Sequence, residues 1–187
     1  MKLEVIITST RPGRIGPSVA RWFHEHAQAA GGPFQVNLTD LAEVGLPLLD
    51  EPNHPSKRDY LHDHTKRWSA IVDGADAFVF VIPEYNYTAP PSFFNALDYL
   101  YQEWAYKPVG LVSYGGVSGG LRSSQSTKPI LTTLRMMPLP EQVMIPNVFG
   151  LLKDGAFTPD VHHRQSADAM LAELAKWAGA LKGLRGA

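Results

Sequence analysis

The sequence predicts an α/β three-layer sandwich, in which one parallel sheet carries helices on both faces. Short strand-like runs alternate with segments of helical periodicity along the chain. Two of the runs, Ala77–Ile82 and Val109–Tyr114, are almost entirely apolar, as expected for strands that are covered on both faces. The 187 residues fit a single domain over 1–187, and 44% of them are hydrophobic, enough for one two-faced core.

Five strands and four helices are expected. The strands are apolar or alternating runs bounded by Gly, Pro or polar residues: Val5–Thr8, Phe34–Leu38, Ala77–Ile82, Val109–Tyr114 and Gln142–Ile145. The helices have apolar residues three and four apart: from Pro17 to Gly31, from Leu61 to Val72, from Pro91 to Trp104, and from Thr158-Pro159 to Leu181. The Pro-rich stretch 47–55 is expected to be a surface loop. Ligands of such sheets bind beyond the carboxyl ends of the strands, so the loops there are the places to seek a site.

Composition excludes several classes of function. The 17 Lys and Arg against 18 Asp and Glu give a net charge of -1, so no global field attracts nucleic acid or a membrane surface. The absence of cysteine excludes disulfides, iron–sulfur clusters and thiolate nucleophiles. No leader pattern or membrane-length apolar run is recognisable, and a cytoplasmic protein is therefore expected.

The loop that follows the first strand suits a phosphate group. It leads into a helix N-terminus, where free amides and the helix dipole favour an anion. The candidate donors are the hydroxyls of Ser9, Thr10 and Ser18, the guanidinium of Arg11, and the backbone at Gly13 and Gly16. The loop is neither a Walker A motif nor a dinucleotide fingerprint. An ordinary turn with solvated arginines would have a similar composition, and Arg14 in particular is expected to face water.

Two further loops could frame a flat ring system. Pro83–Pro91 follows the most apolar strand and places two tyrosines and an asparagine among three prolines, which suits stacking and backbone hydrogen bonds. Ser113–Gly120 contains four glycines that allow the backbone to approach a ligand closely. Each loop taken alone could also be a packed or flexible connection. All three are expected at the same edge of the sheet.

Taken together, these loops resemble the flavodoxin-like NAD(P)H-dependent FMN reductases. The resemblance rests on Ser9-Thr10-Arg11, on Pro83-Glu84-Tyr85-Asn86 followed by Asn95-Ala96-Leu97-Asp98, and on the glycine pairs 115–116 and 119–120, and it covers about residues 1–155. It implies a flavodoxin-like five-stranded parallel sheet of order 2-1-3-4-5. It also implies a set of FMN-binding residues: Ser9, Arg11, Ile15, Gly16, Pro17, Ser18, Pro83, Glu84, Tyr85, Asn86, Tyr87, Ser113, Gly115 and Gly116.

The same resemblance implies the chemistry. FMN is the cofactor, NADPH or NADH donates the electrons, and a small acceptor such as a quinone, flavin, azo compound or metal oxyanion receives two of them. No side chain acts as a catalyst, because flavin N5 accepts the hydride, and ping-pong kinetics are expected. The family is usually dimeric or tetrameric. The segment Phe93–Trp104 is apolar around most of a helix circumference, which favours deep burial or packing against a second subunit, and a homodimer or homotetramer is expected.

Other interpretations stay open at this point. Gly116–Gly120 matches the G-x-S-x-G nucleophile elbow, and Ser118 with a downstream aspartate and histidine would make a serine hydrolase. A non-enzymatic flavodoxin-type electron carrier would share the fold. A metal site is not expected, because His24 with His26, and His62 with His64, would face different directions on a helix, and His162-His163 is expected to be solvated. Lys128-Pro129 departs from the family's pattern and predicts a kink or a helix boundary.

Overall fold

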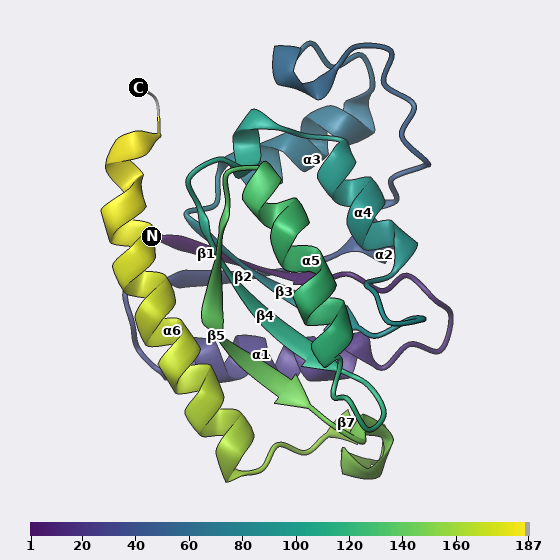
Figure 1. The fold of residues 1–187 in the computed structure, drawn as a ribbon, viewed down its shortest axis with the longest axis vertical. Helices are drawn as coiled ribbons and strands as arrows, with labels where there is room; N and C mark the ends of the chain where they lie inside the picture. The colour runs from purple at the N-terminus through teal and green to yellow at the C-terminus, as the bar shows by residue number, and fades with distance from the viewer. Residues whose placement is uncertain (186–187) are drawn as a thin grey trace.

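The computed structural model, which describes residues 1–185, contains the expected parallel sheet (Figure 1). Its strand order is β2-β1-β3-β4-β5, so the order 2-1-3-4-5 is confirmed. The strands are β1 (Lys2–Ile7), β2 (Gln35–Asp40), β3 (Ala77–Pro83), β4 (Pro108–Tyr114) and β5 (Met137–Ile145). β3 and β4 are buried along their whole length, as their apolar sequences predict.

Helices cover both faces of this sheet, and each face has its own apolar cluster. The helices are α1 (Gly16–Ala29), α2 (Leu41–Val44), α3 (Asp63–Asp73), α4 (Pro91–Asp98), α5 (Leu121–Thr133) and α6 (Val161–Leu181). Helices α1 and α6 pack on one face, through side chains such as Phe23 and Met170. Helices α3, α4 and α5 pack on the other face, through Trp68, Phe93 and Leu131. None of the described helices is long and apolar enough to cross a membrane.

The third predicted helix ends earlier than expected. Helix α4 stops at Asp98, and a separate short turn, η2 (Gln102–Trp104), follows. The break allows the fully buried Trp104 to fold back under the helix, where its indole N–H donates to the Leu97 carbonyl at 3.2 Å. Packing of one large aromatic residue therefore overrides the helical periodicity.

The apolar circumference of α4 is explained within the chain. Phe93 and Leu97 are each 1% exposed, so the helix is deeply buried. The predicted surface loop covers part of it, because the Asn95 amide donates to the Pro47 carbonyl at 2.7 Å and accepts from the Leu49 amide at 2.9 Å. The all-round hydrophobicity of this segment thus does not require a second subunit.

Helix α5 was not identified from periodicity, and the expected boundary at Lys128-Pro129 is wrong. The helix continues through Pro129 to Thr133. Proline lacks the N–H that would bond the preceding turn, but both Pro129 and Gln125 are exposed, so water can satisfy the freed carbonyl. The buried positions of this helix are mostly small and polar, and the apolar signal is correspondingly weak: Ser123, Ser124, Thr127 and Leu131.

Strand β5 begins five residues before the predicted start at Gln142. Pro138 and Pro140 lie in the added part, and a register irregularity between Val109 and Leu111 of β4 accommodates them. The structure also contains a short antiparallel hairpin that was not predicted, formed by β6 (Leu152–Lys153) and β7 (Ala156–Phe157).

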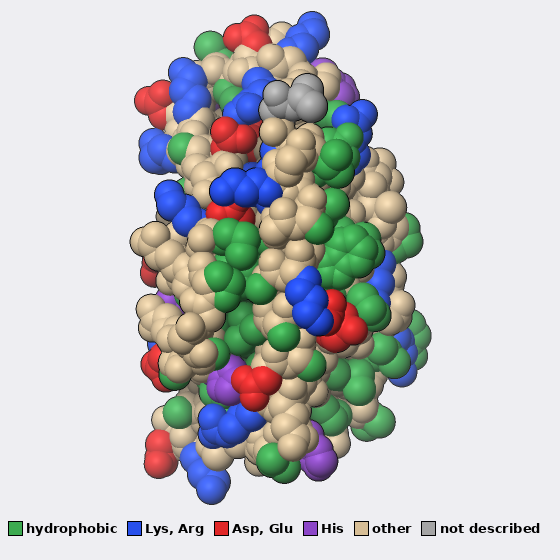
Figure 2. Space-filling model, turned by 90° about the vertical axis from the view of Figure 1, so that its left-hand side faces the viewer, with side chains coloured by type: hydrophobic (Ala, Val, Ile, Leu, Met, Phe, Trp, Pro, Cys, Tyr) green, Lys and Arg blue, Asp and Glu red, His purple; other side chains and the backbone are tan. Residues whose placement is uncertain are grey.

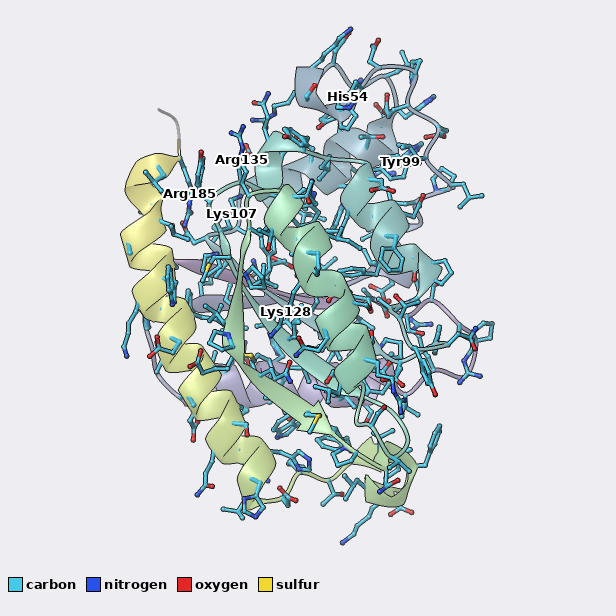
Figure 3. All side chains as sticks on the ribbon, viewed as in Figure 1. His54, Tyr99, Lys107, Lys128, Arg135 and Arg185 are labelled. Carbon is cyan, nitrogen blue, oxygen red and sulfur yellow. The ribbon has the colours of Figure 1, made fainter. Side chains whose placement is uncertain are left out.

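Lys107 and Arg185 lie at the opposite, amino-terminal edge of the sheet, and each bonds groups of the chain itself. The buried Lys107 ammonium donates to the carbonyls of Val72 and Asp73 at 2.7 and 3.0 Å, at the end of α3. Arg185 forms an ion pair with Asp76 at 2.7 Å, and Figure 3 shows it close to Lys107. Figure 2 shows charges of both signs mixed over the α6 side of the molecule.

The histidines differ in part from expectation. His62 caps α3 instead of lying within it, so its ring stacks on that of His64 with centroids 5.1 Å apart, and the two do not face different directions. His163 is 6% exposed and belongs to the capping box of α6, so it is not solvated. Its burial lowers its pKa from the ordinary value, although Asp160 acts in the opposite sense. Among the described residues, no group of three or more ligating side chains could hold a metal ion.

Candidate functional site

The loops after β1, β3 and β4 meet at the carboxyl edge of the sheet, as predicted. They enclose a cavity of about 120 Å³, to which the segment after β5 adds a fourth wall. The lining residues are Arg11, Arg14, Ile15, Pro83, Glu84, Tyr85, Tyr114, Gly115, Gly116, Val148 and Phe149. The volume is below the roughly 300 to 1,000 Å³ of typical ligand sites, so a cofactor would lie partly outside the cavity.

The loop between β1 and α1, the β1 loop, places the Arg11 guanidinium and the N-terminus of α1 at this cavity. Ile15 is the N-cap of α1 and supplies no side-chain hydrogen bond. Pro17 has no N–H and the Ser18 amide bonds the Ile15 carbonyl at 3.0 Å, so within the described chain the amides of Ile15 and Gly16 are left for another acceptor. Arg11 is exposed and lines the cavity. Its guanidinium and the amides together can bind an anion.

Ser9 and Ser18, two of the predicted phosphate donors, do not line the cavity. Ser9 is fully buried, and its hydroxyl is 2.7 Å from the Tyr85 hydroxyl, so it joins the β1 loop to the β3 loop. The Ser18 hydroxyl accepts from the Phe157 amide at 2.7 Å, and Ser18 does not line the cavity. Pro17 fills an early position of α1, where its missing N–H costs no hydrogen bond, and it does not line the cavity either.

Arg14 does not face water, contrary to expectation. Its guanidinium forms an ion pair with Asp40 at 2.6 Å, with the two side chains 20% and 11% exposed. Its Nε is buried and has no hydrogen-bond partner among the described residues. Arg14 also lines the cavity, so its Nε–H is a donor in this region that has no acceptor within the described chain.

The β3 loop forms a tight turn. Tyr85 and Thr88 exchange backbone hydrogen bonds of 2.8 and 3.0 Å, and the two residues between them, Asn86 and Tyr87, have φ values of 50° and 70°. This left-handed pair directs the turn outward, so both residues are exposed and only Pro83, Glu84 and Tyr85 line the cavity.

The β4 loop contributes backbone and one unpredicted side chain. A Cβ at Gly116 would meet no atom within 4 Å, so this backbone is open to a ligand. The Ser113 hydroxyl donates to the Gly119 carbonyl at 2.9 Å inside the loop, and Ser113 does not line the cavity.

Tyr114 is the main residue that sequence reasoning missed. It is 4% exposed and lines the cavity, and its hydroxyl has no hydrogen-bond partner among residues 1–185. Burial raises the pKa of its phenol well above the usual range, so the group stays a neutral donor. Its position as the last residue of an apolar strand, beside the glycines, was the available signal.

Val148 and Phe149 could not have been found from the three motifs. They follow β5, outside the loops that were considered, and Phe149 is 69% exposed at the wall of the cavity. The amides of Asn147 and Val148 bond the carbonyls of Gly116 and Gly115 at 2.8 and 3.1 Å, which holds this segment against the glycine loop.

Ser118 does not form the arrangement that a serine hydrolase requires. Its hydroxyl donates to the Glu84 carboxylate at 2.8 Å, and no imidazole is among its hydrogen-bond partners in the described chain. A nucleophile needs an adjacent base that can accept its proton, and a carboxylate whose pKa is lowered is a poor base. The hydrolase interpretation is therefore not supported.

A larger cleft of about 530 Å³ adjoins the β1 loop at Thr10, between α2 and α4. Its walls are mainly apolar, and the polar groups of Ser92 and Asn95 are already bonded to backbone groups of the chain. The smaller cavity has donors without acceptors and a helix N-terminus, so it is the better candidate for an anion-binding site despite its size.

Comparison with known proteins identifies the family. The family model described as NADPH-dependent FMN reductase matches residues 1–150. An NAD(P)H-dependent FMN reductase of Schizosaccharomyces pombe is 40% identical over 141 residues, which is 74% of this chain and 70% of that protein. A similar enzyme of Nectria sp. is 33% identical over 82% of each chain, and a quinone reductase of Escherichia coli is 34% identical over 73% of each.

Solved structures agree on the fold. The flavoenzyme NAD(P)H:(acceptor) oxidoreductase FerB of Paracoccus denitrificans superposes with a TM-score of 0.67, at 19% identity and with 97% of each chain covered. RosB gives a TM-score of 0.71 at 14% identity, over 98% of this chain and 81% of that one. The expected flavodoxin-like fold is thus confirmed, and the match over residues 1–150 shows that this chain belongs to the NADPH-dependent FMN reductase family.

Proposed function

We propose that the cavity holds the phosphate end of FMN and one edge of its ring, and that a small acceptor reaches the open side. Family membership supplies the general activity, that of a flavoprotein oxidoreductase with FMN as cofactor and NAD(P)H as electron donor. The observation that carries the residue assignment is a set of donors without acceptors in the described chain, around one cavity: the Tyr114 hydroxyl, Arg14 Nε and the amides of Ile15 and Gly16 at the start of α1.

These donors fit a phosphate. Arg11 and the N-terminus of α1 provide positive charge, while Arg14, whose charge is balanced by Asp40, can still donate through its Nε. The other acid at the cavity, Glu84, is neutralised by Arg122 at 2.6 Å and so repels an anion little. Buried donors without acceptors are costly, and a bound phosphate oxygen would remove that cost.

The remaining walls fit a ring. Pro83, Tyr85 and Phe149 offer apolar and aromatic surface, and the backbone at Gly115 and Gly116 can approach a ring edge. FMN, when bound, accepts hydride from NAD(P)H and passes two electrons on to the acceptor. The chain's own contribution is to fix the ring against this wall and to leave one side accessible, with no side chain acting as acid, base or nucleophile.

Of the predicted site residues, the proposal retains those that line the cavity: Arg11, Ile15, Pro83, Glu84, Tyr85, Gly115 and Gly116. Gly16 stays as part of the helix N-terminus. Ser9 and Ser113 act as loop supports. Asn86 and Tyr87 lie at the exposed turn, and the proposal leaves out Pro17 and Ser18, which do not line the cavity.

The visible absorption spectrum of purified protein tests the proposal. Protein mixed with FMN and freed of excess cofactor should show the bound-flavin bands, which should bleach anaerobically on addition of NADPH. Arg11→Ala with Tyr114→Phe should retain much less flavin than wild type. Equal retention by this double variant would refute the assignment, whatever the activity of the wild type.

A quinone is the favoured class of acceptor, because relatives named quinone reductase match 73% of this chain.

A homodimer or homotetramer and a cytoplasmic location stay predictions. The expectation of an oligomer now rests on the resemblance, because α4 is buried within the chain. Sedimentation at micromolar concentration tests this, and a monomer would contradict it.

A further inference from the structure

Helix α5 begins at a point where its own sequence supplies no side-chain cap. Its N-cap is Gly120, with φ of 81°, and a Cβ there would lie 2.7 Å from the Tyr114 amide nitrogen. Gly119 before it has φ of 61°, and its Cβ would lie 2.9 Å from the Pro146 nitrogen. Close packing against the backbone therefore requires glycine at both positions. The Leu121 amide bonds the Ser118 carbonyl at 3.0 Å, and the Arg122 amide takes its acceptor from another segment.

That acceptor is Glu84, from the loop after β3. One carboxylate oxygen accepts from the Arg122 amide at 3.1 Å and from the Ser118 hydroxyl at 2.8 Å. The other oxygen accepts from the Arg122 guanidinium at 2.6 Å. The Glu84 side chain is 9% exposed. Glu84 thus caps α5 across a sequence separation of 38 residues and places a negative charge at the positive end of the helix.

The same cluster also holds the turn at Tyr87. The Arg122 guanidinium lies over the Tyr87 ring, 4.1 Å from its centroid, while Tyr87 occupies the unfavourable left-handed region. A second link follows one residue later, where the hydroxyls of Thr88 and Ser126 are 3.2 Å apart. Side-chain contacts from Glu84, Tyr87 and Thr88 therefore link the β3 loop to the start of α5.

We propose that Glu84 is a positioning residue whose carboxylate, with Ser118 and Arg122, fixes the glycine loop 115–120 and the Tyr87 turn relative to each other. This Glu84 cluster accounts for the G-V-S-G-G stretch that resembled a nucleophile elbow: its serine is a donor to Glu84. The inference rests on the proposed function, because these two loops form the walls of the cavity that we assign to FMN. Glu84 lines the cavity, but both of its carboxylate oxygens bond Ser118 and Arg122, so its role in cofactor binding is to hold these two loops in place.

Hydrogen exchange of the protein without FMN tests the cluster directly. In Glu84→Ala, the amides of residues 115–124 should exchange about tenfold faster or more, because the variant loses charge-assisted hydrogen bonds. Glu173→Ala is the matched control: Glu173 pairs with Lys176 at 2.6 Å on α6, and its loss should leave residues 115–124 unchanged. Unchanged exchange in Glu84→Ala would overturn the proposal.

Smaller changes keep the test valid if Glu84→Ala does not fold. Ser118→Ala removes the hydroxyl's bonds to Glu84 and to the Gly120 amide, and Arg122→Ala removes the ion pair with Glu84 and the contact with the Tyr87 ring. Each should accelerate exchange by about threefold to tenfold in the same peptides. Combining Ser118→Ala with Arg122→Ala should accelerate it further. Normal exchange in all of these variants would likewise overturn the proposal.

FMN titration distinguishes positioning from a purely structural role. The apparent Kd for FMN should rise about tenfold in Glu84→Ala, with Glu173→Ala at the wild-type value. Faster exchange with unchanged FMN affinity would reject positioning. Failure of the wild type itself to bind FMN would reject the proposed function, and the exchange experiment would still report on the cluster.

Discussion

Gly16→Ala is expected to destabilise the protein through one contact with Tyr114. The added Cβ would lie 2.7 Å from the Tyr114 hydroxyl oxygen and 3.3 Å from Cγ2 of Ile7. The first distance is far shorter than non-bonded carbon and oxygen tolerate, and Tyr114 is 4% exposed, so its ring has little room to move. Overpacking of this kind costs about 1 to 3 kcal/mol, against which alanine regains at most about 1 kcal/mol of helix propensity. We expect a net loss of about 1 to 2 kcal/mol.

Urea unfolding of the protein without FMN measures this loss, and two further variants isolate its cause. Gly116→Ala is the control, because a Cβ there meets no atom within 4 Å and its free energy of unfolding should stay near that of wild type. Tyr114→Phe removes the clashing oxygen, so Gly16→Ala in that background should regain about 1 kcal/mol or more. If Gly16→Ala is as stable as wild type, or if Tyr114→Phe restores nothing, the packing argument is refuted.

Three further predictions concern binding, pH and the core. Arg11→Ala should weaken FMN binding by about one to two orders of magnitude, as measured by flavin fluorescence, with Arg21→Ala, an exposed α1 position, as control; equal affinities would remove Arg11 from the site. Burial lowers the pKa of Lys107 to about 8, so between pH 8 and 9.5 the unfolded chain binds more protons and stability should rise with pH, by about 1.5 kcal/mol relative to Lys107→Met. Parallel stability curves for these two proteins would show that the Lys107 pKa is ordinary. Gly110→Ala would place a Cβ 2.5 Å from the Met170 sulfur, and thermal unfolding should reveal a loss of about 1 to 3 kcal/mol unless that side chain moves aside.

The alternation of apolar strands and periodic helices predicted most of the fold. The positions of β3 and β4 followed from runs that are apolar along almost their whole length, as strands buried on both faces are. β1 was predicted from Val5, three residues after its start at Lys2. Helix α5 escaped because its buried face consists largely of Ser123, Ser124 and Thr127, which carry no apolar signal. The early end of α4 escaped because it depends on where Trp104 packs, and that is a tertiary property.

The candidate site was predicted as a set of loops and only in part as a set of side chains. Strand ends place the loops, so their meeting at one edge followed from the topology. The direction of each side chain depends on contacts far away in the sequence. Ser18 turns to Phe157, Arg14 pairs with Asp40, and Glu84 bonds Ser118 and Arg122. No local pattern encodes such partners.

Pro138 and Pro140 of β5 hinder the pairing of separate molecules along this edge of the sheet. β5 is an edge strand, and the Met137 amide bonds inward to the Lys107 carbonyl, so the nitrogen of Pro138 faces outward. An incoming strand that tried to extend the sheet there would find no N–H to bond, and Pro140 repeats the obstacle two residues later. The two prolines, which lie in the part of β5 that was not predicted, thus also protect its edge from amyloid-like stacking.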